Sequence, residues 1–176
     1  LKEYELGDMI PFNFTARDGV ELTGYITLPP TYRKGQKIPF ILHPHGGPNA
    51  KDTFGYRSEV QIYATRGYGV LQVNYRGSVG FGLEKMKLAN KQWSLAMHDD
   101  LLDALSWATD RGFVDTEKVC ISGASYGGYS AMVGITKNSD IFKCAINYVG
   151  VVDLFTLYDD KQWMFADMGR PQQHIE

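Results

Sequence analysis

The stretch that decides the fold is VCISGASYGGY at residues 119–129. It opens with a short apolar run typical of a buried strand and leads into small residues, 127–137, that favour a helix. Between them, Gly123 and Gly127 flank Ser125 in the pattern G-x-S-x-G, which predicts a sharp, strained strand-to-helix turn. We expect the glycines to prevent a clash there, and the Ser125 hydroxyl to lie at the start of the helix, where developing negative charge is stabilised. The alternative, a structural serine in a glycine-rich turn, is disfavoured because strand, turn and helix agree.

The segments around this turn alternate between strand and helix patterns. Residues 10–14 and 20–28 flank an Asp-Gly pair, which predicts a hairpin. Strand-like and helical stretches then alternate at 39–42, 54–66, 70–74, 99–111, 119–122, 127–137, 144–149 and 153–165. This order predicts an α/β fold with a mostly parallel central sheet, helices on both faces and ligands at the carboxyl ends of the strands. We expect Asp99 or Asp100 to cap the helix at 99–111.

A second motif, HGGP at residues 45–48, directly follows a predicted strand. In hydrolases such a turn provides a backbone N–H group to an oxyanion hole. We therefore predict the N–H groups of Gly47 and Tyr126 as oxyanion donors; the alternative is an ordinary Gly-Gly-Pro turn. His43 and His45 do not predict a metal site, because no third ligand lies nearby in the sequence. His45 is interpreted as a structural histidine that holds its loop.

Together with NYRGSVGFG at 74–82, these motifs resemble the catalytic domain of the prolyl oligopeptidase family, and most closely its acylaminoacyl-peptidase-like branch. The similarity covers residues 10–170. It implies an α/β-hydrolase fold and a serine peptidase that acts on short peptides. By the match of motifs, Ser125 is the expected nucleophile, and Gly47 and Tyr126 are the expected oxyanion donors.

The resemblance also implies a domain organisation. Residues 1–176 are expected to form one partial catalytic domain, truncated at its C-terminal end, with a hairpin at 10–28 and a core at 39–176. Family members usually carry an N-terminal β-propeller, which in this protein would lie upstream of Leu1. The loop at 76–82 lacks the lysine of a phosphate-binding loop and the spacing of a dinucleotide fingerprint, so we expect Arg76 to anchor it by hydrogen bonds.

A serine hydrolase also needs a histidine base and an acid that orients it. After Ser125 the sequence offers one histidine and several candidate acids, namely His174 with Asp153, Asp159, Asp160 and Asp167. No strand pattern follows residue 149, so we do not expect these residues to complete a triad; Asp153 is interpreted as a helix cap. The chain alone is therefore predicted to be nearly inactive. A bare sheet edge near 144–149 is expected to favour an oligomer or aggregation.

Composition narrows the partners and the setting. With 18 basic and 20 acidic residues the formal charge is −2, so nucleic acid is not expected as a partner. No apolar run approaches the roughly 18 residues that cross a bilayer. Serine chemistry needs no cofactor, and none is predicted. Cys120 and Cys144 are interpreted as buried free thiols, which favours a reducing, cytoplasmic setting.

Two other functions share these motifs. An esterase or lipase-like hydrolase would use the same acyl-enzyme steps, and a non-catalytic scaffold could retain the turn without the chemistry. An apolar cluster near the C-terminus is open to two interpretations, a specificity pocket or, preferably, the packed face of a helix; it comprises Phe155, Tyr158, Trp163, Met164 and Phe165.

Overall fold

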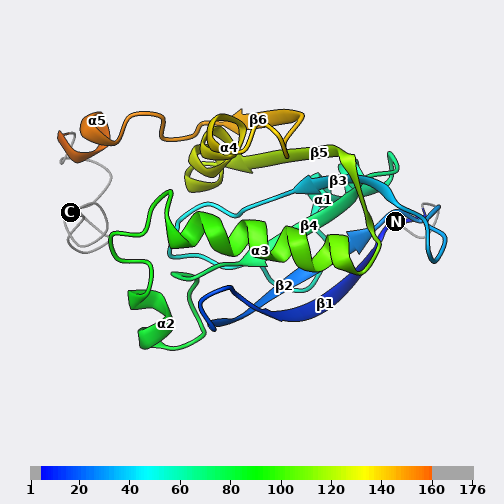
Figure 1. Cartoon of the computed structure of the whole chain (residues 1–176), viewed down its shortest axis with the longest axis horizontal. Helices are drawn as coiled ribbons and strands as arrows, with labels where there is room; N and C mark the ends of the chain where they lie inside the picture. The colour runs from blue at the N-terminus through cyan, green and yellow to red at the C-terminus, as the bar shows by residue number, and fades with distance from the viewer. Residues whose placement is uncertain (1–4, 160–176) are drawn as a thin grey trace.

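A single six-stranded sheet forms the centre of the computed structural model, which describes residues 5–159 (Figure 1). Its order is β1-β2-β4-β3-β5-β6. The strands are β1 (Asp8–Thr15), β2 (Glu21–Leu28), β3 (Ile38–Leu42), β4 (Gly69–Asn74), β5 (Val114–Ala124) and β6 (Cys144–Tyr148). β1 pairs antiparallel with β2, and β2 antiparallel with β4, whereas β4, β3, β5 and β6 run parallel. The predicted hairpin and mostly parallel sheet are confirmed.

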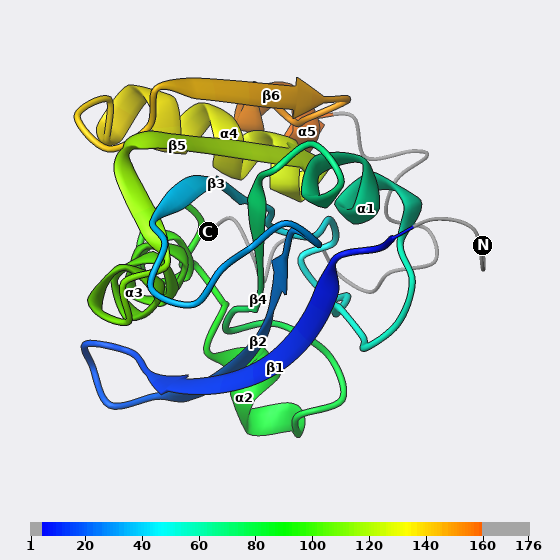
Figure 2. The ribbon, with the colours of Figure 1, turned by 90° about the vertical axis from the view of Figure 1, so that its right-hand side faces the viewer.

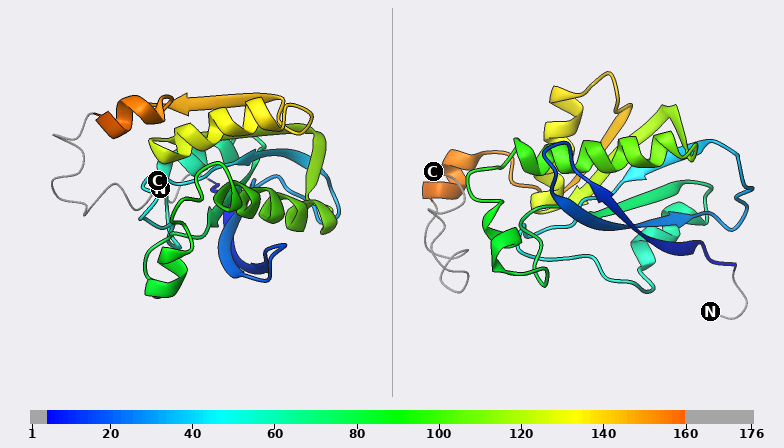
Figure 3. Two further views of the ribbon diagram at one scale, coloured as in Figure 1. Left: turned by 60° about the vertical axis from the view of Figure 1, so that its left-hand side comes forward. Right: turned by 60° about the horizontal axis from the view of Figure 1, so that its bottom comes forward.

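Helices cover both faces of this sheet. They are α1 (Ser58–Ala64), α2 (Leu83–Lys87), α3 (Ala96–Asp110), α4 (Tyr126–Lys137) and α5 (Leu154–Asp159). Seen along the sheet, α1 and α3 lie on opposite faces (Figure 2). α4 packs on β5 and β6 and lies on the same side as α3 (Figure 3). This arrangement confirms the predicted layers.

The core lies between the central strands and α3. Phe40 and Leu42 of β3 are fully buried, as is Leu71 of β4. Their continuous apolar runs fit parallel strands that are covered on both faces. From α3, Met97 and Leu101 pack against them and are also fully buried.

The predicted cap of α3 is wrong. The helix begins at Ala96, before the expected residue 99, and no side chain caps its N-terminus. The buried Asp100 carboxylate instead accepts hydrogen bonds from Arg76, and the Asp99 carboxylate pairs with Arg17. The Asp100 carboxylate, which local propensity predicts as a helix cap, is bound instead in a tertiary ion pair. The helix expected at 54–66 is likewise shorter, at Ser58–Ala64.

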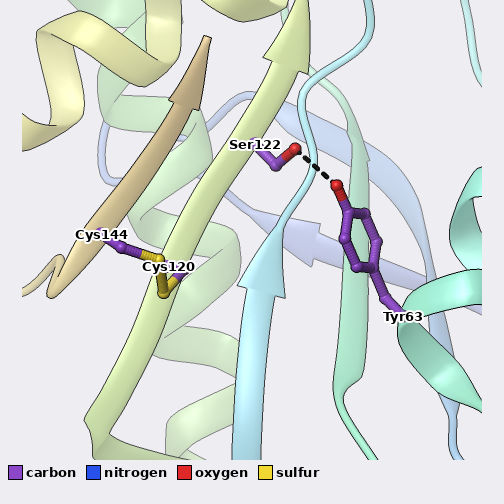
Figure 4. Close-up of a disulfide and its surroundings, with 4 residues drawn as sticks. All are labelled: Tyr63, Cys120, Ser122 and Cys144. Carbon is purple, nitrogen blue, oxygen red and sulfur yellow. Dashed lines mark hydrogen bonds between the residues drawn. A yellow bond between two sulfur atoms is a disulfide. The ribbon is translucent and has the colours of Figure 1, made fainter. Parts of the chain in front are cut away.

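The expectation of buried free thiols is also wrong. Cys120 and Cys144 form a disulfide between β5 and β6, with Cα atoms 4.8 Å apart (Figure 4). The two residues are register partners in neighbouring parallel strands, and Cys144 is exposed. Because both cysteines are paired in the disulfide, free thiols give no reason to expect a reducing, cytoplasmic setting.

Within residues 5–159 the predicted edge near 144–149 is present, because β6 is the last strand of the sheet there and most of its side chains are exposed. Asp153 caps α5 as predicted, since its Oδ1 accepts from the N–H of Phe155 at 2.9 Å. The Phe155 side chain itself is 85% exposed, which contradicts the packed-face interpretation at that residue. Trp163, Met164 and Phe165 lie outside the described residues. Among residues 5–159, no helix has the length and apolar character that a bilayer crossing requires.

Candidate active site

Ser125 occupies the turn between β5 and α4. Its φ of 56° and ψ of −119° place it in a region that residues with a side chain rarely adopt. A Cβ on Gly123 would lie only 2.5 Å from the carbonyl carbon of Gly127. Ser125 is exposed, whereas Gly123 and Tyr126 on either side are buried. The predicted strained turn with an accessible serine is therefore present.

The backbone around Ser125 leaves free donors at the helix start. The Ser125 N–H donates to the Tyr148 carbonyl of β6 at 3.1 Å, and the Ser125 carbonyl accepts from the Tyr129 N–H at 3.0 Å. The first N–H groups of a helix have no intrahelical partner, and in α4 the first is that of Tyr126. Negative charge is stabilised at this end of a helix.

The HGGP turn packs directly against the serine turn. A Cβ on Gly127 would lie 2.2 Å from the Pro44 carbonyl oxygen. A Cβ on Gly46 would lie 3.4 Å from the Ser125 Cβ. Gly47 is exposed, with a φ of 124° that favours glycine. The structure thus brings the two predicted motifs together, and the absence of a side chain at Gly127 permits their close approach. The donor roles of Gly47 and Tyr126 stay predictions.

His45 is built into the loop, as expected. Its Nδ1 lies 2.7 Å from the Gly46 carbonyl, which can only accept, and its Nε2 lies 3.0 Å from the Ser78 hydroxyl. The ring stacks on Tyr75 with centroids 4.4 Å apart. Burial lowers the pKa of His45 to about 4, so the imidazole is neutral at pH 7. Sequence reasoning missed Tyr75 and Ser78, although both stand in the quoted motif at 74–82.

Arg76 anchors the loop after β4, as predicted. Its backbone N–H, Nε and Nη2 donate to the buried Asp100 carboxylate at 2.8, 2.9 and 2.7 Å. Its Nη1 lies 2.8 Å from Asp18 at the tip of the β1–β2 hairpin. These hydrogen bonds raise the pKa of Arg76. For Asp100, burial raises the pKa by more than the same bonds lower it. Because arginine stays protonated, the pair is charged and ties hairpin, loop and α3 together.

No histidine of the described residues is hydrogen bonded to Ser125. His45 is engaged as above, His98 Nε2 lies 2.8 Å from Asn138 Oδ1, and His43 Nε2 lies 3.7 Å from Glu59. His174, Asp160 and Asp167 lie outside the described residues. Within residues 5–159, His, Cys, Asp and Glu side chains form no group of three that could hold a metal ion.

Comparison with known proteins gives consistent likenesses. A sequence model of the prolyl oligopeptidase family matches residues 54–175. The chain is 41% identical over 153 residues to dipeptidyl aminopeptidase BIII of Pseudoxanthomonas mexicana, covering 84% of this chain and 22% of that protein. The acylaminoacyl peptidase of Pyrococcus horikoshii superposes with a TM-score of 0.82 at 30% identity, over 90% of this chain and 26% of the other.

A second solved structure, an acylaminoacyl peptidase in complex with Z-Gly-Gly-Phe-chloromethyl ketone, has a TM-score of 0.85 at 29% identity. It covers 99% of this chain and 28% of that one. These neighbours confirm the α/β-hydrolase fold. The chain spans about a quarter of the length of the curated relatives that it matches.

Proposed function

Because this chain belongs to the prolyl oligopeptidase family, we propose that it supplies the nucleophile and the oxyanion hole of a serine peptidase that hydrolyses short peptides. The observation that carries the proposal is the exposed, positive-φ Ser125 with the Gly46 turn packed against it. Backbone held in such a sparsely populated region is common at active sites. The peptidase names of the relatives support peptides as substrates.

The chemistry follows from these groups. Ser125 Oγ attacks the carbonyl carbon of the scissile bond while a base takes the hydroxyl proton. The N–H groups of Gly47 and Tyr126 donate to the oxyanion of the tetrahedral intermediate. The intermediate collapses as the C–N bond breaks and the leaving amine takes the proton from the base. Water then hydrolyses the acyl-enzyme by the same steps. Loss of one oxyanion donor typically costs about 10²- to 10³-fold in rate.

The base is proposed to lie beyond residue 176, since the three described histidines have other partners and no strand pattern after residue 149 would place His174 in a triad. Removal of the histidine of a serine protease lowers kcat by about 10⁶-fold. We therefore expect residues 1–176 alone to turn over an aminoacyl anilide very slowly, and the full-length protein to turn it over readily.

The test is labelling by a fluorophosphonate probe, measured by intact mass, on residues 1–176 and on the full-length protein. Labelling should occur in the full-length protein and be lost in Ser125→Ala. Ser106→Ala is the matched control, because Ser106 is exposed on α3, away from the turn. Absence of labelling in both forms would favour the scaffold function. Faster turnover of esters with no cleavage of peptides would favour an esterase.

A further inference from the structure

The loop that carries the HGGP turn is bound along its length to the loop that follows β4. The Asn49 Nδ2 donates to the Gly77 carbonyl at 3.1 Å. The Val79 N–H donates to the Ala50 carbonyl at 3.0 Å. At the start of the turn, the Tyr75 hydroxyl donates to the His45 carbonyl at 2.8 Å. The loop after β4 is therefore the support on which the turn rests.

The Tyr75 phenol is suited to be a fixed donor. Tyr75 is 1% exposed, and burial raises its pKa well above the ordinary value, so the hydroxyl keeps its proton. Its ring is stacked on the His45 imidazole and therefore has little freedom to turn. The hydroxyl thus holds one carbonyl in one direction.

That carbonyl belongs to the peptide unit immediately before the one that carries the Gly47 N–H. Gly46 and Gly47 lack side chains that would restrict their dihedral angles, so the turn needs external contacts to keep one orientation. Pro44 and Gly46 lie close to Gly127 and Ser125, since a Cβ added to Gly127 would lie 2.2 Å from the Pro44 carbonyl oxygen. The peptide unit that carries the Gly47 N–H is held by His45, whose Nδ1 lies 2.7 Å from the Gly46 carbonyl. Tyr75 in turn holds His45, through its hydroxyl bond to the His45 carbonyl and through ring stacking.

We propose that Tyr75 is a positioning residue for the oxyanion hole, acting through His45 on the Gly47 N–H. The inference rests on the proposed function. It predicts that Tyr75→Phe, which keeps the ring and removes the hydroxyl, lowers kcat by about 10- to 100-fold with KM nearly unchanged, because small misplacements of this kind cost about 10²-fold. A purely structural role would affect stability and both kinetic constants together.

The experiment uses the full-length protein, with the concentration of active sites set by fluorophosphonate titration. It compares the inhibition constants of a peptide trifluoromethyl ketone, whose hemiketal places an oxyanion in the hole, and of the matching peptide with that carbonyl reduced to a methylene group, which cannot. In Tyr75→Phe the ketone should bind about 10- to 100-fold more weakly and the peptide equally well. Tyr63→Phe is the matched control: it removes a partly buried phenol that bonds Ser122, at 3.0 Å, on β5 (Figure 4).

The outcomes separate the two proposals. A wild-type protein that is not labelled contradicts the proposed function itself. A labelled wild-type protein with unchanged ketone affinity in Tyr75→Phe overturns the positioning role, as does an equal loss for ketone and peptide. If Tyr75→Phe does not fold, Ser78→Ala must show the selective loss of ketone affinity, because it frees both the Tyr75 carbonyl, which the Ser78 hydroxyl bonds at 2.7 Å, and the His45 ring. Unchanged affinity in that variant overturns the proposal.

Discussion

At the scale of single residues, the buried His45 makes stability depend on pH. Burial lowers its pKa from 6.5 to about 4 in the folded state. Below pH 6.5 the unfolded chain takes up a proton that the folded chain does not, so stability falls as the pH falls toward 4. At about 1.4 kcal/mol per pH unit, the lowered pKa of this histidine reduces the free energy of unfolding by about 3 kcal/mol at pH 4. Urea unfolding of wild type and His45→Gln between pH 7 and 4.5 measures the effect.

The variant is expected to be less stable at pH 7, because it loses the stacked ring, but to lose less stability on acidification. Other buried groups, including His43 and His98, titrate in both proteins and cancel in the difference between the two curves. Parallel curves over this pH range would contradict the prediction.

Sequence alone predicted the local chemistry of the serine turn but not what it contacts. The strained Ser125 and the need for glycine at 123 follow from a strand that meets a helix within a few residues. Gly127 is required for a different reason, the approach of the Pro44 carbonyl from another strand end. Tyr75 could not be assigned either, because its partner His45 is distant in sequence. Contacts between loops depend on how strands are ordered, which local patterns do not encode.

At the scale of elements, the disulfide fixes the edge strand β6 to β5. It closes a sequence separation of 24 residues, for which loop entropy predicts about 3 kcal/mol of stabilisation. The carbonyl of Tyr148 at the other end of β6 accepts from the Ser125 N–H. We therefore expect the double variant Cys120→Ala, Cys144→Ala to be less stable and to exchange β6 amide hydrogens faster, as measured by mass spectrometry.

Reductant supplies the control for this prediction. Reduction should accelerate exchange in β6 of the wild type and leave the double variant unchanged. The strands β3 and β4 in the sheet centre should be affected little at low denaturant, because they are buried on both faces. Equal exchange in β6 before and after reduction would show that the disulfide does not hold the strand.

Predictions for elements failed where tertiary contacts outweighed local preference. Asp100 stands where an N-cap is expected, yet its carboxylate is bound by Arg76 from the loop after β4. The sequence pattern predicts Cys120 and Cys144 as apolar strand residues. Only the register of β5 with β6 places them opposite each other. Element type was therefore predictable from periodicity, while bounds and cross-strand pairs required the assembled sheet.

At the scale of the whole molecule, the parallel strands explain why three separate motifs form one site. The strands β3, β4 and β5 run in the same direction. The segments at their carboxyl ends, 45–48, 74–82 and 123–129, therefore lie on the same side of the molecule. This convergence was predictable from the alternation of strands and helices. The base and acid were not, since the sequence pattern predicts no further strand after β6 to carry them.

Among the described residues, no strand pairs with the outer edge of β6, and this predicts self-association of residues 1–176. Ile146 is 46% exposed and Tyr148 is 68% exposed, and a net charge of only −2 gives little mutual repulsion. Light scattering over a concentration series should show a mass that rises above that of the monomer.

Ile146→Lys should lower this mass, because a charged side chain on an edge strand opposes pairing. Ile62→Lys is the matched control, since Ile62 is 51% exposed on α1. Equal effects of the two substitutions would place the association surface elsewhere, and a monomer at all concentrations would refute the prediction.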